Sequence, residues 1–271
     1  MNTAMSQTTL HVWVDGVGVI APGLPDWPTA RAVLCGEHAL AAAPSVLPVP
    51  QLLPAAERRR ASRVVKLALA LGIEAAAHAQ CDTATLTTVF AASGADGHNC
   101  HALCEQLASD DRQISPTRFH NSVHNAAAGY WGIATRSMAP CQVLCAYDAS
   151  FGAGLLDAAA QAQYDGEPVL LIAYDSEYPE PLHAKRDTPD AAGVAMVLRA
   201  ERSEHSLAAL RISFSSESAT SMADSGLEFL RQHIPALRGL PLLQLLAQRQ
   251  ARTVCLDYLQ PMQLRIDVLP C

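Results

Sequence analysis

The stretch 142–158, QVLCAYDASFGAGLLDA, decides how this chain is interpreted. The apolar run at 143–146 predicts a buried strand, and the small residues after it predict a tight turn followed by an amphipathic helix. This strand–turn–helix layout exposes one side chain at the helix N-terminus, where backbone N–H groups and the dipole can activate a nucleophile or hold an anion. We place Asp148 at that tip, and a carboxylate is a poor substitute for a thiolate in acyl transfer.

Composition limits the class of protein and its partners. The chain has 271 residues, of which 50% are hydrophobic and 17% are charged, so a sizeable core is expected rather than extended disorder. The formal net charge of −7 argues against nucleic acid or an anionic membrane as the main partner. One basic cluster at helical spacing is interpreted as a solvated face, with docking of an acidic partner as the alternative. It consists of Arg58, Arg59, Arg60, Arg63 and Lys66.

The sequence carries no signal for a membrane or for secretion. No apolar run reaches the length of about 18–20 residues that a transmembrane helix needs. The N-terminal residues MNTAMSQTTL lack the basic and apolar regions of a signal peptide. We therefore predict a cytoplasmic protein whose cysteines are reduced thiols.

Strands and helices are expected to alternate through residue 175, after which the chain ends mainly in strands. Expected strands cover 10–20, 85–92, 141–147, 168–175, 191–199, 207–214 and 263–269. Expected helices cover 28–36, 55–80, 97–109, the small-residue segment 120–138, 151–164, 226–234 and 240–251. This order predicts an α/β layered domain with helices covering the sheet.

Several of these segments, in chain order, resemble the N-terminal half of a β-ketoacyl synthase of the thiolase-like superfamily. They are VWVDGVGVIAPG, RRASRVVKLALALGIEAAAHA, VFAASGADG, SPTRFHNSVHNAAAGYWGIA, the elbow at 140–158, PVLLIAYDSE and AAGVAMVL. The SVHNAAAG run and the short chain are most similar to chain-length-factor proteins of aryl-polyene and type II polyketide systems. The resemblance implies a thiolase-like layered αβα fold, truncated relative to a full ketosynthase. Residues 10–215 would form the ketoacyl-synthase-like domain, and 216–271 a short remnant with helices and a final strand.

The chain departs from this family at two places. Aligned with the family's Cys-x-Ser elbow, it has Asp148-Ala149-Ser150, so the nucleophile is replaced. The synthases also take two histidines, or a histidine and an asparagine, from their C-terminal half. Here the residues after 215 contain a single histidine, His233, in a helical context. We therefore predict no catalytic residue, a vestigial elbow formed by Asp148, Ser150 and Phe151, and no cofactor or metal.

Asp148 has three interpretations at this stage. It could be a structural cap that accepts backbone N–H bonds at the helix start, it could assist decarboxylation of a malonyl unit, or it could be inert. We favour the cap, with some partner for the carboxylate because an unpaired buried charge is costly. Cys145 is the rival nucleophile, but on a straight strand it points away from position 148. We interpret Cys145, and Cys141 on the same strand face, as buried core thiols.

Two further clusters are weighed against simpler explanations. His98, Cys100, His101 and Cys104 could present metal ligands from one helix, but no second Cys/His pair is visible, so a helix covering the sheet is favoured. His124, Ser150 and Asp148 could be proposed as a Ser–His–Asp arrangement. The simpler expectation is that His124 and Asn125 hydrogen-bond the loop that carries them.

The resemblance implies a non-catalytic subunit that pairs with an active ketosynthase through a shared strand at 141–147, joined by the segment 121–133. Acyl carrier protein would reach it through that complex. Candidate tunnel and interface residues are Phe119, Val123, His124, Asn125, Tyr130, Trp131, Cys141, Val143 and Cys145. Phe119, Val123 and Tyr130 would line or close a product tunnel, and Tyr130 and Trp131 would suit an interface core. The alternatives are a truncated acyltransferase or malonyl decarboxylase that uses Asp148 or Cys145, and a homodimeric scaffold.

Overall fold

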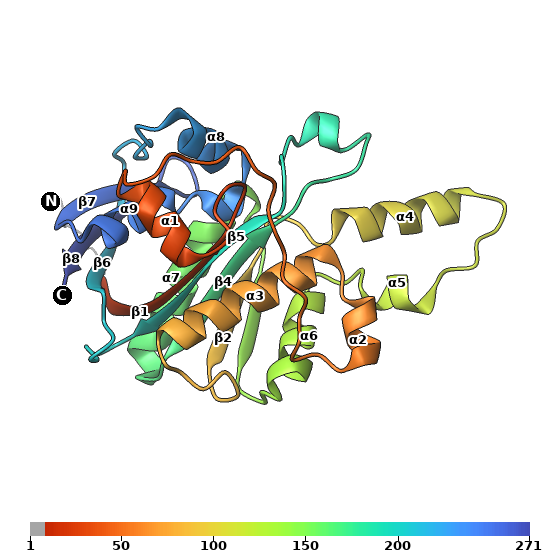
Figure 1. Cartoon of the computed structure of the whole chain (residues 1–271), viewed down its shortest axis with the longest axis horizontal. Helices are drawn as coiled ribbons and strands as arrows, with labels where there is room; N and C mark the ends of the chain where they lie inside the picture. The colour runs from red at the N-terminus through yellow and green to blue at the C-terminus, as the bar shows by residue number, and fades with distance from the viewer. Residues whose placement is uncertain (1–8) are drawn as a thin grey trace, which may run out of the picture.

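A mixed sheet of eight strands runs through the computed structural model, which describes residues 9–271 (Figure 1). The strands are β1 (Leu10–Ile20), β2 (Thr87–Ala91), β3 (Cys141–Leu144), β4 (Val169–Asp175), β5 (Ala192–Arg199), β6 (Ala208–Ser215), β7 (Arg252–Asp257) and β8 (Gln263–Pro270). Their order across the sheet is β3-β2-β4-β5-β1-β6-β8-β7. The strands β3, β2 and β4 are parallel, and all other neighbours are antiparallel.

Helices cover both faces of the sheet, and the alternation of side chains along each strand supplies both hydrophobic cores. The helices are α1 (Trp27–Leu34), α2 (Ala55–Arg60), α3 (Arg63–His78), α4 (Gly97–Ala108), α5 (Pro116–His120), α6 (Ala126–Thr135), α7 (Ser150–Asp165), α8 (Ser225–His233) and α9 (Leu240–Gln248). On β4, Leu171 joins the cluster that contains Leu155 of α7, whereas Ile172 joins the cluster that contains Leu67 of α3. The expected thiolase-like α/β layering is therefore confirmed.

Helix α3 lies unusually close to β1. A Cβ atom added at Gly16 would lie 2.2 Å from the carbonyl oxygen of Ala75, and one added at Gly18 would lie 2.4 Å from that of Leu71. Only glycine fits at these two positions, because the backbone of the helix occupies the space that a side chain would need. The glycines of the DGVG sequence thus set the distance between the sheet and its main covering helix.

Several expected boundaries are wrong. The expected helix 55–80 is two helices, because Ala61 is extended (φ −61°, ψ 118°) between α2 and α3. The basic cluster is therefore divided between two helices. The expected helix 120–138 begins only at Ala126, after the short α5. The expected strand 141–147 ends at Leu144, and Tyr147 then takes a positive φ of 52°.

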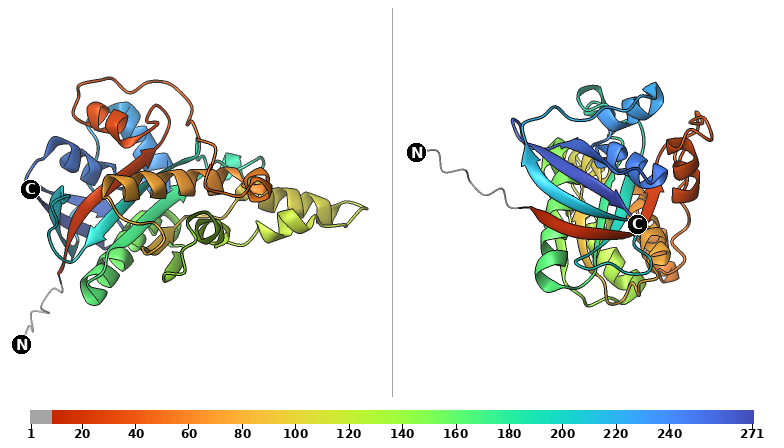
Figure 2. Two further views of the ribbon diagram at one scale, coloured as in Figure 1. Left: turned by 60° about the horizontal axis from the view of Figure 1, so that its bottom comes forward. Right: turned by 90° about the vertical axis from the view of Figure 1, so that its left-hand side faces the viewer.

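The C-terminal segment joins the same sheet. Strand β8 pairs with β6, and β7, which the sequence did not predict, pairs with β8. The expected helix 240–251 ends at Gln248 because Arg249 is left-handed (φ 50°), which frees the next residues for β7. The division between 10–215 and 216–271 stays a prediction, and in the fold both parts share one sheet (Figure 2).

One element projects from the body. Figures 1 and 2 show α4 and the chain that leads to α5 extending beyond the end of the sheet as an arm. Only Leu103 of α4 is buried. The expectation that this helix covers the sheet is therefore wrong. No helix within the described residues is both long and apolar enough to cross a bilayer, and the cytoplasmic location stays a prediction.

Candidate functional site

The turn between β3 and α7, here called the elbow (residues 145–150), is closed by Ser150. Its Oγ accepts the backbone N–H of Ala146 at 3.0 Å and donates to the carbonyl oxygen of Tyr147 at 2.7 Å. Phe151 is fully buried, and a Cβ atom added at Gly239 would lie 2.2 Å from its ring. Ser150 and Phe151 therefore hold the elbow in shape, against the C-terminal segment.

Asp148 pairs with arginine side chains from two other segments. Nη2 of Arg186 donates to Oδ1 of Asp148 at 2.8 Å, and Nη2 of Arg238 lies 3.8 Å from Oδ2. No side chain caps either the short 3₁₀ helix Tyr147–Ala149 or α7. The interpretation of Asp148 as a helix cap is therefore wrong, because its carboxylate is directed at guanidinium groups rather than at backbone N–H groups. The expectation that it has a partner is confirmed.

Arg186 is enclosed at the elbow. Its guanidinium carbon lies 4.1 Å from the centroid of the Tyr147 ring, and its side chain is 16% exposed. Burial alone would lower the pKa of Arg186, but the hydrogen bond and charge of Asp148 raise that pKa above its ordinary value. Tyr147, whose φ is positive, thus contacts the same guanidinium that Asp148 binds.

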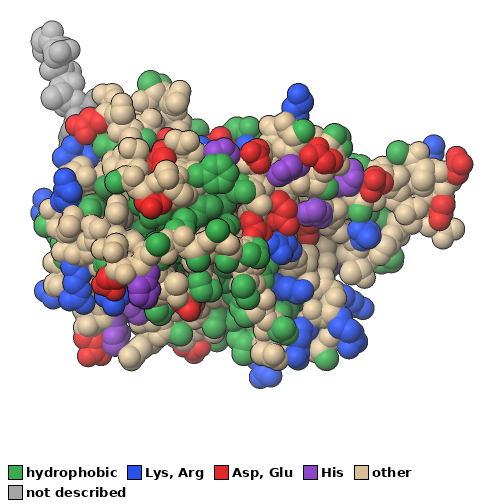
Figure 3. All heavy atoms as spheres, turned by 45° about the horizontal axis from the view of Figure 1, so that its top comes forward, with side chains coloured by type: hydrophobic (Ala, Val, Ile, Leu, Met, Phe, Trp, Pro, Cys, Tyr) green, Lys and Arg blue, Asp and Glu red, His purple; other side chains and the backbone are tan. Residues whose placement is uncertain are grey.

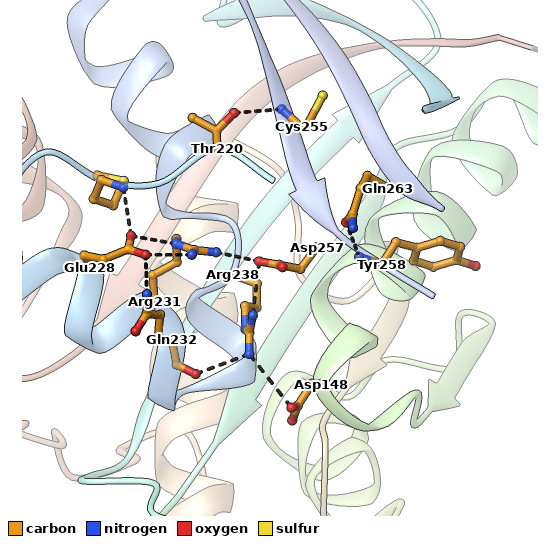
Figure 4. A network of polar contacts seen from close by, with 11 residues as sticks. Asp148, Thr220, Glu228, Arg231, Gln232, Arg238, Cys255, Asp257, Tyr258 and Gln263 are labelled. Carbon is orange, nitrogen blue, oxygen red and sulfur yellow. Dashed lines mark hydrogen bonds and ion pairs between the residues drawn. The ribbon is translucent and has the colours of Figure 1, made fainter. Parts of the chain in front are cut away.

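A chain of ion pairs continues from Arg238 into the C-terminal segment (Figure 4). Nη1 of Arg238 lies 3.1 Å from Asp257 Oδ2, at the end of β7. Asp257 also pairs with Arg231 of α8, which in turn pairs with Glu228 at 2.7 Å. The hydrogen bond from Arg231 lowers the pKa of Glu228 to about 2. These contacts tie α8 and β7 to the elbow.

Asp175, at the end of β4, is a buried carboxylate that the sequence analysis missed. It accepts hydrogen bonds from the Ser93 N–H at 2.8 Å, the Ser93 hydroxyl at 2.6 Å and the Ala236 N–H at 2.8 Å. Burial raises its pKa to about 6, against the lowering effect of these donors. The sequence did contain a signal for this residue, because Asp175 is an acid placed directly at the end of a continuous apolar strand.

The cysteines of β3 are exposed rather than buried. Both Cys141 and Cys145 are exposed in this chain, because β3 is a four-residue strand at the edge of the sheet. The Cys145 thiol donates weakly to the carbonyl oxygen of Ser93 at 3.4 Å. The expectation of two buried core thiols is therefore wrong. The strand also ends before Cys145, so the alternation argument does not fix where that thiol points relative to Asp148.

The proposed Ser–His–Asp arrangement is not formed. Ser150 closes the turn and Asp148 pairs with Arg186, while the buried Nε2 atom of His124 makes no hydrogen bond. In the projecting arm, His98 faces Glu177 at 3.7 Å and His101 faces Glu105 at 3.3 Å. Within residues 9–271 no group of three or more His, Cys, Asp or Glu side chains is arranged to hold a metal ion.

The candidate tunnel and interface residues separate into two groups. Phe119 is 65% exposed and Val123 is 49% exposed, whereas Tyr130 and Trp131 are almost fully buried. The Tyr130 hydroxyl donates to Asn121 Oδ1 at 3.2 Å, and Trp131 packs edge-on against Phe90 of β2. Tyr130 and Trp131 therefore belong to the core of this chain, and Phe119 and Val123 are available to a partner.

An apolar groove of about 410 Å³ lies between α3 and the segment 41–54, with Val49, Leu52 and Ile73 among its walls. Figure 3 shows apolar side chains gathered over the middle of the molecule, with acidic and histidine side chains toward the arm. Helix α3 and the elbow helix α7 pack on opposite faces of the sheet. The groove is therefore separate from the elbow.

The chain belongs to the β-ketoacyl synthase, N-terminal domain family, whose model matches residues 34–258. The solved ketosynthase (ApeO) in complex with its chain length factor (ApeC) from Xenorhabdus doucetiae is similar, with a TM-score of 0.72 and 22% identity over 95% of this chain and 99% of the matched one. The ishigamide ketosynthase/chain length factor gives a TM-score of 0.70 and 14% identity over 96% and 99%.

A third structure is the AntDE:AntF complex, in which a type II polyketide synthase acyl carrier protein is bound to its ketosynthase. It gives a TM-score of 0.70 and 10% identity over 97% of this chain and 100% of the matched one. At these identities the likeness establishes the fold. A search of the curated proteins gave no match.

Proposed function

We propose that the protein is a non-catalytic, chain-length-factor-like subunit that forms a heterodimer with an active β-ketoacyl synthase. Its pathway would be polyketide biosynthesis of the aryl-polyene type, or a fatty-acid-like one. One observation carries the proposal: Asp148, which the sequence pattern aligns with the family's nucleophile, is bound to Arg186 at 2.8 Å. A carboxylate engaged in an ion pair is not available to attack a thioester. The similarity to complexes described as ketosynthase with chain length factor supports the same assignment.

The free edge of β3 supports pairing with a second chain. Thr88 N donates to Pro140 O, and Ala92 N donates to Leu144 O, so the even-numbered residues of this strand face β2. The backbone groups of Cys141 and Val143 are therefore directed away from β2. An edge strand of this kind is a template for pairing with another strand. A partner strand here would extend the sheet from one subunit into the next.

The exposed apolar side chains at α5 support a role in the complex. Phe119 and Val123 lie at and just after α5, and the arm formed by α4 projects from the same end of the sheet (Figure 1). Large apolar side chains left exposed together are typical of a surface that a partner covers. We assign them to the wall that bounds the growing product. Acyl carrier protein would reach this chain through the heterodimer.

The experiment that tests the proposal is co-expression with an active β-ketoacyl synthase from the same organism, with only one of the two chains tagged. We expect the two chains to co-purify in equal amounts, and the complex to carry acyl groups on the ketosynthase only. If this chain elutes alone as a folded monomer or homodimer in the presence of the ketosynthase, the proposal fails. A homodimer would then favour the scaffold, and a monomer would favour the enzymatic alternative.

One observation favours an enzymatic alternative. Cys145 is an exposed thiol at the elbow, which a truncated acyltransferase or malonyl decarboxylase could use. Intact-protein mass after incubation with acyl-loaded carrier protein separates the two functions. A stable acyl adduct that disappears in Cys145→Ser would favour the enzyme, whereas an unmodified chain favours the non-catalytic subunit. The control is Cys104→Ser, which removes an exposed thiol from the arm instead.

A further inference from the structure

The segment 176–190, here called the elbow loop, connects β4 to β5 and crosses the elbow. Its Arg186 reaches Asp148, as described above. At its other end, Tyr178 packs on the backbone where α4 begins. The closeness of this packing shows at Gly94, where an added Cβ atom would lie 2.1 Å from the Tyr178 hydroxyl. One added at Gly97 would lie 2.5 Å from the same ring. The elbow loop therefore contacts the elbow at one end and the base of the arm at the other.

Polar contacts follow the same path. Glu177 of the elbow loop pairs with Arg63 of α3 at 3.1 Å, and its carboxylate lies 3.7 Å from Nε2 of His98 in α4. Burial raises the pKa of Tyr178, while hydrogen bonds to Arg186 and Ser93 oppose that rise. Ser93, which lies just before α4, is also the residue that Asp175 holds. The arm base, the elbow loop and Arg186 thus form one connected set of polar contacts.

Arg186 has few other means of balancing its charge. Its Nε atom is buried without a hydrogen-bond partner, as is that of Arg238. The side chains of both arginines are 16% exposed, whereas Asp148 is 44% exposed. Removing the carboxylate would leave the largely enclosed Arg186 guanidinium without the acid that it contacts at 2.8 Å, whereas Arg238 would keep Asp257 at 3.1 Å. An enclosed charge that loses its partner is far more costly than a broken surface pair. Asp148 is therefore needed to keep the guanidinium group of Arg186 at the elbow.

We propose that Asp148 and Arg186 form a latch that holds the elbow loop across the elbow and, through Tyr178, fixes the base of the α4 arm. Asp148 is then a positioning residue that occupies the place of a nucleophile. The latch is a property of this chain alone. Its test therefore does not depend on whether the chain pairs with a ketosynthase.

Hydrogen–deuterium exchange of the full-length chain tests the latch through Asp148→Asn, which removes the charge and keeps the shape. We expect amides of residues 176–190 and of residues 93–104 to exchange about tenfold faster than in the wild type, while those of β4 and β5 are unchanged. The matched control is Asp187→Asn, which removes another carboxylate from the same loop. The Asp187 side chain is 64% exposed and lies 3.6 Å from Nε2 of His183. That variant should exchange like the wild type.

A double-mutant cycle separates the latch from a role of Asp148 that does not involve Arg186. Arg186→Met keeps most of the side-chain bulk over Tyr147 and removes the charge. In a latch, the double variant accelerates exchange of the elbow loop by less than the two single variants together, because each single variant already breaks the same contact. Additive effects of the two single variants would overturn the proposal.

Chemical rescue gives a readout that a general loss of stability would not reproduce. Asp148→Ala leaves space for a small carboxylate between the two arginines, so formate should slow exchange of the elbow loop again. Formamide has the same shape without the charge and should not slow this exchange. Chloride at equal ionic strength should not slow it either. The proposal is wrong if Asp148→Asn leaves residues 93–104 and 176–190 unchanged, or if formate has no effect on Asp148→Ala.

Discussion

At the scale of single residues, Asp148 is held at the elbow by side chains from distant segments. The elbow still presents a side chain at the start of α7, but that side chain is an acid whose oxygens face Arg186 and Arg238. A thiolate nucleophile requires a partner that withdraws its proton and a free approach to the carbonyl carbon. At this elbow the nearest charged partner is Arg186, which stacks on Tyr147 and cannot accept a proton from a thiol.

A cysteine placed at position 148 should not by itself make the elbow catalytic. We expect Asp148→Cys to form no acyl adduct with acyl-loaded carrier protein, and to unfold at a lower temperature than the wild type because Arg186 and Arg238 lose their shared carboxylate. Intact-protein mass and thermal unfolding measure the two effects. Asp148→Glu, which keeps the charge, is the control and should retain most of the stability. An acylated Asp148→Cys chain would contradict this prediction.

Asp175 should make stability depend on pH. Its pKa is raised from 3.8 to about 6 in the folded chain, so between these values the unfolded chain has lost the proton that the folded chain keeps. The contribution is therefore fully present below pH 3.8 and is lost as the pH rises through about 6. Relative to Asp175→Asn, the wild type should lose up to about 1.4 kcal/mol of unfolding free energy per pH unit in this window. Urea denaturation at a series of pH values measures the slope, and parallel curves for the two proteins would refute it.

At the scale of elements, the packing of α3 against β1 depends on a missing side chain. Gly16→Ala places a Cβ atom 2.2 Å from the backbone oxygen of Ala75, so the helix must move away from the sheet. We expect this overpacking to lower the free energy of unfolding by about 1–3 kcal/mol. Gly129→Ala in α6 is the control, because nothing lies within 4 Å of the added atom, and alanine is favoured over glycine inside a helix. Equal effects of the two variants in urea denaturation would show that the close approach is unimportant.

The outward edge of β3 makes a second prediction at this scale. Val143→Pro removes a backbone N–H that is directed away from β2, and proline is tolerated at such edge positions. We expect the chain to stay folded and to lose its association with the ketosynthase. Val143→Thr, which keeps the N–H, should still associate. Co-purification and circular dichroism measure the two properties, and a stable heterodimer formed by Val143→Pro would exclude a strand shared at this edge.

At the scale of the whole molecule, the candidate tunnel residues should differ in what they control. Phe119 and Val123 are exposed, so Phe119→Ala and Val123→Ala should lengthen or broaden the product distribution of the ketosynthase complex without lowering stability. Tyr130 is buried, so Tyr130→Ala should leave a cavity and lower the unfolding free energy by about 3 kcal/mol or more. Product analysis and denaturation of the same three variants test this division. If the product distribution is unchanged in both Phe119→Ala and Val123→Ala, these two residues do not line the tunnel.

Sequence patterns predicted the fold well where one segment carried the whole signal. The apolar run before Asp175 predicted β4, and the spacing of apolar residues after the elbow predicted α7. The patterns failed where a single backbone conformation ended an element. Ala61 divides a long helical pattern, and Arg249 ends α9 and thereby permits β7. Such conformations depend on neighbouring segments, which periodicity does not encode.

The sequence by itself determined that this chain has a layered α/β fold of the ketosynthase family and an aspartate at its elbow, because those features are local in the chain. Only the tertiary structure decided what Asp148 binds, since Arg186 lies 38 residues away along the chain. It also decided that Tyr130 and Trp131 are buried while Cys145 is exposed. Burial and ion pairing are properties of surfaces that segments distant in sequence form together, and they exist only once the sheet has assembled.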